Sequence, residues 1–449
     1  YMWGISGIIS KDKIDINYLR EISYKINHRG TDNQGFWQSD NKRIAFAHNR
    51  LTIIDLSNLS NQPMIYNNGR YIVSYNGEIY NFKKLKKELE EKAHKFYSNT
   101  DTEVLVHLYE EYGKNFVDHL DGMFACAVWD LKNKKLIIAR DRLGVKPMYY
   151  WFKDNNLIFA SEIKSILQYE EVERELNFSG LCQFVTYAYT IDGQTLLKNI
   201  NELLPGHRLT YDISEKSLKI EKYWDLRLEK NTFAENENFD QVKKLLENAI
   251  DKRKVSDAPI GALLSGGLDS SIMVAMLAKL IDTPVRTFTT GFGNELDEFD
   301  EAKIVAEHCK TNHTEILIDF SDLTKSLPKI LWHMEFPFGR PSILSNYMVS
   351  QAIKKHVTVA YTGEGSDELF GGYNRYLPFV KDNTAFERGK NLEIISSGFF
   401  KNEEFRNGTF SKNVLQHYMN KNHPSNVFGK IIQKYPEHNT LNKALLFEL

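Results

Sequence analysis

The chain has 449 residues, of which 42% are hydrophobic and 26% charged, and its 57 basic and 59 acidic residues leave a formal net charge of −2. This length exceeds what one hydrophobic core usually holds, so we expect at least two domains. The near balance of charge argues against a dedicated nucleic-acid surface. No run approaches the ~18 apolar residues that a membrane span needs. These properties favour small-molecule partners over nucleic acid or membranes.

The three cysteines, Cys126, Cys182 and Cys309, are scattered along the sequence. The N-terminal run YMWGISGIIS is too short for a signal peptide and lacks its basic flank. Together these features predict a reducing, cytoplasmic environment. Because no CxxC pair or Cys/His cluster occurs, the sequence predicts no structural zinc site.

The first part of the chain, residues 1–210, has the pattern of short strands around two helices. Runs of β-branched or aromatic residues bounded by Asn, Asp and Gly predict strands at 46–55, 71–77, 122–130 and 135–140. Apolar residues at helical spacing predict helices at 81–94 and 102–113. This mixture predicts an α+β domain with a large antiparallel component.

A polar stretch separates this part from the next. The run DLRLEKNTFAENENFD, around 225–240, has little apolar content, and we assign 211–238 to an interdomain linker. From 239 to 449 strands and helices alternate. Strands are predicted at 260–264, 285–292 and 357–363, and helices at 239–253, 271–281, 301–310 and 346–356. Repeated β-loop-α units predict an α/β domain with a parallel sheet, which binds ligands beyond the carboxyl ends of its strands.

The first of two distinctive loops is SGGLDSS at 265–271, between a buried strand and a helix start. Its glycines let the backbone approach an anion, and the N–H groups of the helix start point at that anion. Asp269 can hold Mg²⁺ against phosphates. No Lys follows the glycines, so the Walker pattern of kinases and GTPases is absent. Taken alone, the motif fits a phosphate site and an ordinary capped helix start equally well.

The second loop, TGEGSDELFGGY at 362–373, packs three carboxylates and four glycines into twelve residues after another strand. Carboxylates facing a phosphate loop repel ATP unless Mg²⁺ bridges them, so the pair of loops predicts a metal-bound nucleotide. The alternative, an acidic surface turn that caps a helix, leaves the paired glycines unexplained.

Together these loops resemble the synthetase domain of asparagine synthetases, an ATP pyrophosphatase fold. The resemblance implies cleavage of ATP between its α and β phosphates, which gives an acyl-adenylate and pyrophosphate. It assigns Glu364 and Asp367 to carboxylate activation, and Asp269 with Asp367 to the metal. The implied ATP-binding residues are Leu264, Ser265, Gly266, Gly267, Asp269, Ser270, Thr362 and Gly363.

The sequence departs from this family at two points of its second part. Thr362 stands where many members have Ser, which retains the hydroxyl. The sequence ends at KALLFEL, whereas the family continues into a helical segment that supplies a basic residue to the leaving pyrophosphate. We therefore expect either an incomplete chain or an incomplete adenylation site.

The first part resembles class II glutamine amidotransferase domains, which have an N-terminal nucleophile-hydrolase-like sandwich fold. The resemblance rests on GISGII, HRGTDNQG, AHNRLTIID, YNGEIYN, NTDTEV and the run from DGMFACAVWD to ARDRLGVKPMYY. It implies that Arg50 binds the glutamine α-carboxylate and that Glu78 and Asp101 bind its ammonium group. Asn76 and Gly77 are the implied oxyanion donors, consistent with amide N–H groups aimed at a developing charge. For Arg50 taken alone, a surface ion pair is the better explanation.

The family's nucleophile is missing. Family members begin M-C-G, lose the methionine, and attack glutamine with the exposed cysteine, whose own amine is the base. Here the run is Tyr1-Met2-Trp3-Gly4, so Trp3 occupies the cysteine's position. Indole offers no nucleophile comparable with thiolate, so glutamine hydrolysis should fail. An altered terminus and a natural loss, with free ammonia or another amine as nitrogen source, both remain open.

Three classes of function follow. The leading hypothesis is an asparagine-synthetase-type ligase that uses ATP and Mg²⁺, activates aspartate or a similar carboxylate, and takes glutamine or ammonia as its other substrate. A related ligase of the lactam-forming or peptide-cyclising type activates a different carboxylate and uses another amine. A degenerate, non-catalytic subunit is the third. A homodimer is compatible with each.

Overall fold

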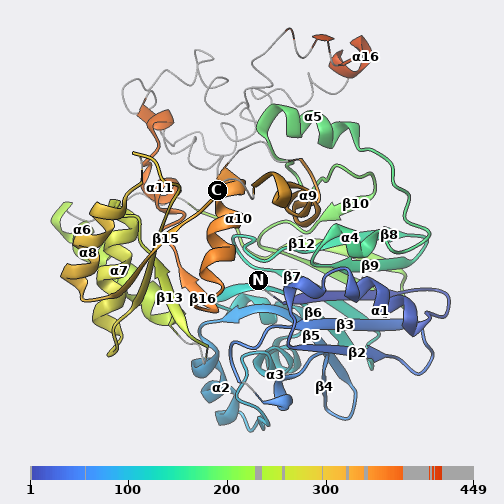
Figure 1. Cartoon of the computed structure of the whole chain (residues 1–449). Helices are drawn as coiled ribbons and strands as arrows, with labels where there is room; N and C mark the ends of the chain where they lie inside the picture. Colours follow the sequence, from blue (N-terminus) through green and yellow to red (C-terminus); the bar gives the residue numbers. More distant parts are fainter. Residues whose placement is uncertain are drawn as a thin grey trace. The chain divides into compact units, whose positions relative to one another are not determined.

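The computed structural model describes residues 3–55, 57–227, 235–254, 258–295, 297–319, 323–337, 342–377, 404, 407–408 and 410–416. The described residues form two compact units (Figure 1). The first contains the residues up to Leu176 together with Asp192–Arg227, and the second contains Asn177–Ile191 and the residues from 235 onward. No helix in the described ranges is long and apolar enough to cross a membrane.

The first unit contains two antiparallel sheets of six strands each. In spatial order the first sheet has β10 (Ile200–Glu202), β8 (Tyr149–Lys153), β9 (Asn156–Ala160), β1 (Gly4–Ile9), β3 (Ile44–Arg50) and β2 (Asn33–Gln38). The second has β12 (Ser217–Lys222), β11 (His207–Asp212), β7 (Lys135–Arg140), β6 (Gly122–Asp130), β5 (Tyr71–Ile79) and β4 (Met64–Tyr66).

The two sheets pack face to face through a largely apolar core, which His48 of β3 crosses to reach the carbonyl of Tyr75 on β5. Ile5 and Phe46 of the first sheet share one cluster with Ile72 and Trp129 of the second. Helices cover the outer faces: α1 (Ile16–Tyr24) and α4 (Ile163–Ile166) lie on the first sheet, and α2 (Phe82–Glu91) and α3 (Glu103–Tyr112) on the second. The predicted α+β class with a large antiparallel component is confirmed for this unit.

Several predicted elements need adjustment at their ends. The strand expected at 46–55 stops at Arg50, and the helix expected at 81–94 stops at Glu91. Residues 211–222, assigned to the linker, include the end of β11 and all of β12, which pair as a hairpin. Helix α6 (Glu235–Arg253) begins before the predicted 239. Short 3-10 turns occupy Asn27–Arg29, Asn58–Ser60 and Gly113–His119.

The second unit contains one parallel sheet in the order β15 (Asn312–Leu317), β14 (Arg286–Gly291), β13 (Ile260–Leu263) and β16 (Val359–Tyr361). Its longer helices are α5 (Phe178–Tyr187), α6, α7 (Leu268–Leu280), α8 (Phe299–Cys309), α9 (Leu323–Met334) and α10 (Ser342–Ile353). The short elements are α11 (Ser366–Phe370), a 3-10 turn at Asn374–Tyr376 and α16 (Lys412–Val414).

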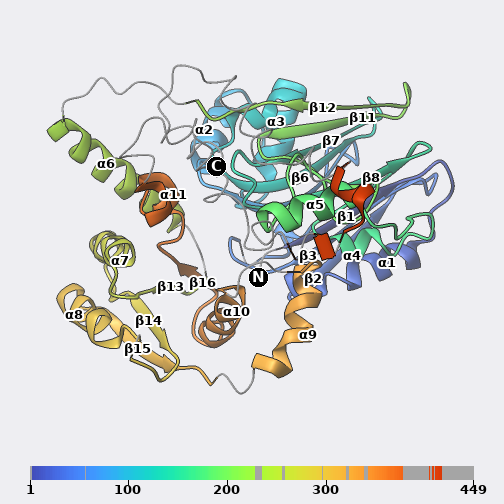
Figure 2. The ribbon, with the colours of Figure 1, turned by 90° about the horizontal axis from the view of Figure 1, so that it is seen from above.

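Helices cover both faces of this sheet (Figure 2). On one face Ala262 packs with Val274 of α7 and Ala302 of α8. On the other face Phe288 packs with Ile353 at the end of α10 and the adjoining Val357. Since β14 and β16 lie on opposite sides of β13, the direction of winding reverses at β13. The predicted parallel α/β sheet is confirmed, and the ends of β13 and β16 lie at its switch point, where sheets of this kind generally bind ligands.

Candidate active sites

The loops that follow β13 and β16 leave the same edge of the sheet, because these strands are parallel neighbours. They are also in direct contact. A Cβ atom added to Gly363 would lie 3.1 Å from the backbone nitrogen of Ser270 and 3.3 Å from Cβ of Asp269. The structure therefore brings together the two motifs that the sequence separates by almost a hundred residues.

The first loop is held by its own hydroxyl groups. The Oγ atoms of Ser265 and Ser270 are 2.9 Å apart, and Ser271 Oγ donates to the carbonyl of Gly267 at 2.7 Å. Gly266 has φ +78°, and an added Cβ would lie 2.5 Å from Cβ of Glu301, so no larger residue fits without movement. Gly267 caps α7, whose first N–H groups have no intrahelical acceptor.

A cavity of about 770 Å³ lies beside both loops. Every residue predicted for ATP binding or carboxylate activation lines it except Gly266 and Gly267. The lining members of that predicted set are Leu264, Ser265, Asp269, Ser270, Thr362, Gly363, Glu364 and Asp367. A volume of this size suits a ligand as large as a nucleotide.

The acidic part of the cavity comes from the second loop. Tyr373 donates its hydroxyl to Glu368 Oε1 at 2.6 Å, which fixes that carboxylate. A Cβ on Gly372 would lie 2.1 Å from Oδ1 of Asp367, so a larger residue there would displace that carboxylate. Asp269 and Asp367 offer carboxylate oxygens to the same cavity, and such hard donors suit Mg²⁺.

The cavity also contains residues that the motifs did not predict. Thr289 and Thr290 come from the carboxyl end of β14, whose position as a neighbour of β13 was predictable only in outline. Asp297 accepts N–H bonds from Phe292 at 2.8 Å and Gly293 at 2.7 Å. The Phe292 bond is the main reason that the pKa of Asp297 is lowered.

Helix α10 contributes three further residues to this cavity, Ser342, Asn346 and Val349. Ser342 and Asn346 belong to the run WHMEFPFGRPSILSNY, which begins in α9. Residues 338–341 of that run lie outside the described residues. The cavity thus has a phosphate-loop side and a separate polar side formed by α10.

In the first unit, Trp3 is a packed core residue that is 4% exposed. Its ring meets His48 and Tyr75 edge to face, with centroids 5.7 and 5.5 Å away. Its Nε1–H donates to the carbonyl of Leu51. The position that the resemblance gives to a nucleophile therefore holds a hydrogen-bonded indole.

Arg50, at the end of β3, is buried and already engaged. Its guanidinium donates to the carbonyl of Ser57 at 3.0 Å and to Oδ1 of Asn61 at 2.8 Å. It also donates to the carbonyl of Asp55 and to Oγ of Ser60. Burial lowers the pKa of Arg50. Because Arg50 is 4% exposed, the alternative of a surface ion pair does not hold for it. The predicted binding of a glutamine carboxylate would require that carboxylate to exchange with these acceptors.

Asp101 is fully buried and accepts from two groups of β5. The hydroxyl of Tyr75 donates to Oδ2 at 2.8 Å and the N–H of Ile79 at 2.9 Å. Burial raises the pKa of Asp101. Glu78, on the same strand, lies near Lys146, a residue that the motifs did not predict. Burial lowers the pKa of Lys146 to about 8, and the negative charge of Glu78 opposes that shift.

Asn76 differs from these residues because its side chain is unpaired. It is 1% exposed, and neither Nδ2 nor Oδ1 has a hydrogen-bond partner among the described residues. A buried amide without partners is costly and is usually explained by a ligand, water or catalytic role. Gly77 follows it on β5, where an added Cβ would lie 2.2 Å from the carbonyl oxygen of Met123. The pair fits the predicted oxyanion donors.

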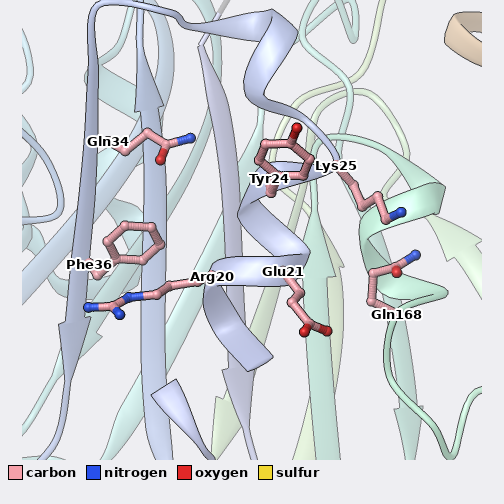
Figure 3. A pocket seen from close by; sticks show the side chains of 7 residues that line it. All are labelled: Arg20, Glu21, Tyr24, Lys25, Gln34, Phe36 and Gln168. Carbon is pink, nitrogen blue, oxygen red and sulfur yellow. The ribbon is translucent and has the colours of Figure 1, made fainter. Parts of the chain in front are cut away.

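A separate surface hollow of about 570 Å³ lies between α1 and β2 (Figure 3). Figure 3 shows Arg20 reaching toward Phe36, and its guanidinium carbon lies 5.8 Å from the ring centroid. None of the predicted site residues lines this hollow. It contributes nothing to either candidate active site.

These two sites belong to a two-part protein, with a glutamine-amidotransferase-like sandwich and an α/β unit whose paired loops fit a nucleotide. The sequence matches the family models "Glutamine amidotransferase domain" over residues 2–224 and "Asparagine synthase" over residues 241–449. The chain belongs to the glutamine-dependent asparagine synthetase family.

Relatives extend over most of the sequence. A provisionally named asparagine synthetase (glutamine-hydrolyzing) 2 of Methanocaldococcus jannaschii is 34% identical over 88% of this chain and 80% of its own length. Asparagine synthetase (glutamine-hydrolyzing) 1 of Bacillus subtilis is 33% identical over 84% of this chain and 59% of its own length. Amidase chry2 of Gibberella zeae is 32% identical over 78% of this chain and 54% of its own length. The chain thus spans little more than half of the last two relatives.

Proposed function

We propose that this chain is an ATP-dependent, amide-forming ligase of the cytoplasm. It activates aspartate or a similar carboxylate as an acyl-adenylate and takes ammonia, because its own glutaminase is inactive. The observation that carries the ligase proposal is the contact between the two loops, with Gly363 packed against Asp269 and Ser270 at the cavity edge. This contact puts a phosphate loop and a carboxylate loop around one ligand space.

Different residues of the cavity bind the phosphates, the metal and the carboxylate substrate. The α7 N-terminus and the serines of 265–271 bind the phosphates, whose negative charge the helix dipole stabilises. Asp269 and Asp367 would hold Mg²⁺, which supplies charge neutralisation at the phosphates when it is bound. Glu364 and the polar residues of α10 orient the carboxylate that is activated. Adenylation requires the carboxylate oxygen to face the α-phosphate, and this positioning is the chain's main contribution.

The proposed lack of glutaminase activity rests on Trp3. The indole is buried and hydrogen-bonded, so no sulfur stands at the nucleophile's position, and Cys126, the cysteine of the first unit, is buried on β6. Burial raises the pKa of the Cys126 thiol to about 12, which leaves it protonated. Glutamine hydrolysis through a thioester has no nucleophile in such a pocket.

A second candidate keeps the adenylation step and changes the substrates. The loss of the nucleophile favours it, because a ligase that uses a substrate amine needs no glutaminase. The similarity to a relative named as an amidase is consistent with this alternative. The first candidate requires aspartate and ammonia, whereas the second requires another carboxylate.

The test is exchange of labelled pyrophosphate into ATP by the full chain, with aspartate and a panel of other carboxylates. Exchange that depends on aspartate supports the first candidate, and exchange that depends on another carboxylate supports the second. Asp367→Asn should abolish exchange, whereas Asp282→Asn, an exposed control outside the cavity, should not. No exchange with any carboxylate would leave a non-catalytic subunit as the explanation.

A repair experiment tests the glutaminase proposal separately. Trp3→Cys, with Tyr1 and Met2 removed so that the cysteine amine is free, restores both the nucleophile and its base. This variant should release glutamate from glutamine, and the same substitution with Tyr1 and Met2 retained should not. A folded repaired chain without activity would show that the pocket lacks more than its sulfur.

A further inference from the structure

A cluster of two histidines and one glutamate, none of them a predicted site residue, lies in the first unit. His94, His107 and Glu110 each offer one ligand atom, and these atoms all lie within 4.8 Å of one another. None of them belongs to a motif discussed above. We propose that this cluster binds one Zn²⁺ ion, or a chemically similar transition metal, that ties the chain after α2 to α3.

Local structure explains how the three side chains meet. Ala93 adopts φ +70°, and the backbone N–H of His94 donates to the carbonyl of Leu89 at 3.1 Å, so the chain folds back at the end of α2. His107 and Glu110 are three residues apart on α3 and therefore share a face of that helix. The turn after α2 places His94 opposite this face.

The distances between ligand atoms fit a compact metal site. The Nδ1 atoms of His94 and His107 are 2.9 Å apart. Oε2 of Glu110 lies 3.7 Å from the first and 4.0 Å from the second. Bonds of ~2.0–2.1 Å at a tetrahedral angle put ligand atoms roughly 3.3 Å apart, a value between the observed distances. Small side-chain movements would equalise the three separations around an ion.

Groups around the cluster orient the ligands as they do in known metal sites. Nε2 of His94 faces Oε1 of Glu111 at 2.9 Å, and Nε2 of His107 lies 3.7 Å from Oε1 of Glu103. Asn67 donates to Oε1 of Glu110 at 3.2 Å, which leaves Oε2 turned toward the histidines. A carboxylate behind a metal-binding histidine, as Glu111 is behind His94, is the usual outer-shell arrangement, and Glu103 would need to move only slightly to play this part for His107.

Burial adds an independent argument. His107 is fully buried, and its Nε2 has no hydrogen-bond partner among the residues that the structure describes. Its ring packs on Phe96 and Tyr66, with centroids 4.2 and 4.8 Å away. His94 and Glu110 are 12% and 22% exposed, so an ion and one water molecule can enter from this side. Imidazole ligands favour Zn²⁺ over Mg²⁺ or Ca²⁺.

The position of the cluster indicates what the ion would do. His94 and His107 flank the segment that carries Asp101, and Glu103 in the same segment accepts the backbone N–H groups of Tyr97 and Ser98, each at 2.8 Å. Zn²⁺ would cross-link the two ends of this segment. The inference does not depend on the proposed ligase activity, because every group involved lies in the first unit.

The test is calorimetric titration of the chelator-treated full chain with Zn²⁺, supported by the visible spectrum with Co²⁺. One equivalent should bind, with the absorption of four-coordinate cobalt, and thermal stability should rise with Zn²⁺. Glu111→Gln should weaken binding ~10–100-fold, and His94→Ala and Glu110→Gln by at least as much. His119→Ala, an exposed histidine just after α3, should bind Zn²⁺ unchanged.

Glu110→Gln separates loss of metal binding from misfolding, because glutamine has nearly the same shape as glutamate and its side-chain oxygen can still accept from Asn67. Near-ultraviolet circular dichroism checks that this variant stays folded. Full-strength Zn²⁺ binding by folded His94→Ala and Glu110→Gln would overturn the proposal. So would the absence of a Zn²⁺-dependent signal in the unmodified chain, which would leave a hydrogen bond between the two histidine rings as the only interaction there.

Discussion

Removing the Trp3 side chain should cost the first unit a large share of its stability. The indole is 4% exposed, packs edge to face on His48 and Tyr75, and donates to the carbonyl of Leu51. Truncating a buried tryptophan to alanine costs about 3–5 kcal/mol, and a hydrogen bond contributes roughly 1 kcal/mol of such a loss. Free energies of unfolding are usually about 5–15 kcal/mol in total, so Trp3→Ala should remove a large part of the first unit's stability.

Thermal unfolding of the full chain measures this loss. A unit of this size shifts its Tm by ~2–4 °C per kcal/mol, so Trp3→Ala should lower the first unit's transition by roughly 6–20 °C. Trp3→Phe keeps an aromatic ring in contact with His48 and Tyr75, so its Tm should lie between those of the unmodified chain and Trp3→Ala. Tyr24→Ala, at a side chain that is 71% exposed in the same unit, should change stability by only about 0.5 kcal/mol. Equal shifts for Trp3→Ala and Tyr24→Ala would refute the view that the indole is part of the core.

Three further predictions address the second unit's loops and a buried histidine. Asp269→Asn should weaken the binding of Mg-ATP more than the binding of AMP, because AMP lacks the β and γ phosphates. Equal losses of affinity for the two nucleotides in calorimetry would show that Asp269 does not bind the metal. Gly266→Ala should weaken Mg-ATP binding at least tenfold, because this glycine has a positive φ and an added Cβ would meet Glu301 at 2.5 Å. Gly365 has φ +93° but open space around an added Cβ, so Gly365→Ala should weaken Mg-ATP binding less, and the same calorimetry compares the two variants. Burial lowers the pKa of His48 to about 3, so as pH falls from ~6.5 toward 3 the unfolded state takes up a proton that the folded state refuses. Stability should therefore fall by up to ~1.4 kcal/mol per pH unit from this group, and denaturant titrations should show that slope in the unmodified chain and not in His48→Gln.

Elements with a strong pattern were predictable from the sequence. The runs of β-branched and aromatic residues at 71–77 and 122–130 match the buried strands β5 and β6, which pair along their full length. The sequence could predict that the loops at 265–271 and 362–373 lie on the same side of the sheet, since the carboxyl ends of parallel strands meet at one edge. Ten residues were assigned to that site, and of these only Gly266 and Gly267 do not line the cavity.

Other features depend on contacts that no local pattern encodes. The predicted strand at 46–55 continues into the apolar residues Leu51, Ile53 and Ile54, yet pairing ends at Arg50, whose guanidinium binds the segment that follows. The hairpin of β11 and β12 was hidden because β12, with the sequence SLKIEK, is largely polar and lies at a sheet edge. Lys146 gave no signal as a buried lysine, since only the fold places it near Glu78.

The zinc proposal runs against the expectation from cysteine and histidine counting. That expectation relied on short spacings such as CxxC, whereas His94 and His107 are thirteen residues apart. The spacing of His107 and Glu110 on one helix face was visible in the sequence, although such pairs are common on solvated helices. Only the turn at Ala93 brings the third ligand to them.

The central claim is a ligase that forms amides without its own glutaminase. The most direct measurement supplies the full chain with Mg-ATP and the carboxylate that supports pyrophosphate exchange, and offers either ammonium or glutamine as the nitrogen source. Amide and AMP should form with ammonium, whereas glutamine should yield neither amide nor glutamate above background. Glutamate release coupled to amide formation, still present after alkylation of all three cysteines, would contradict the account.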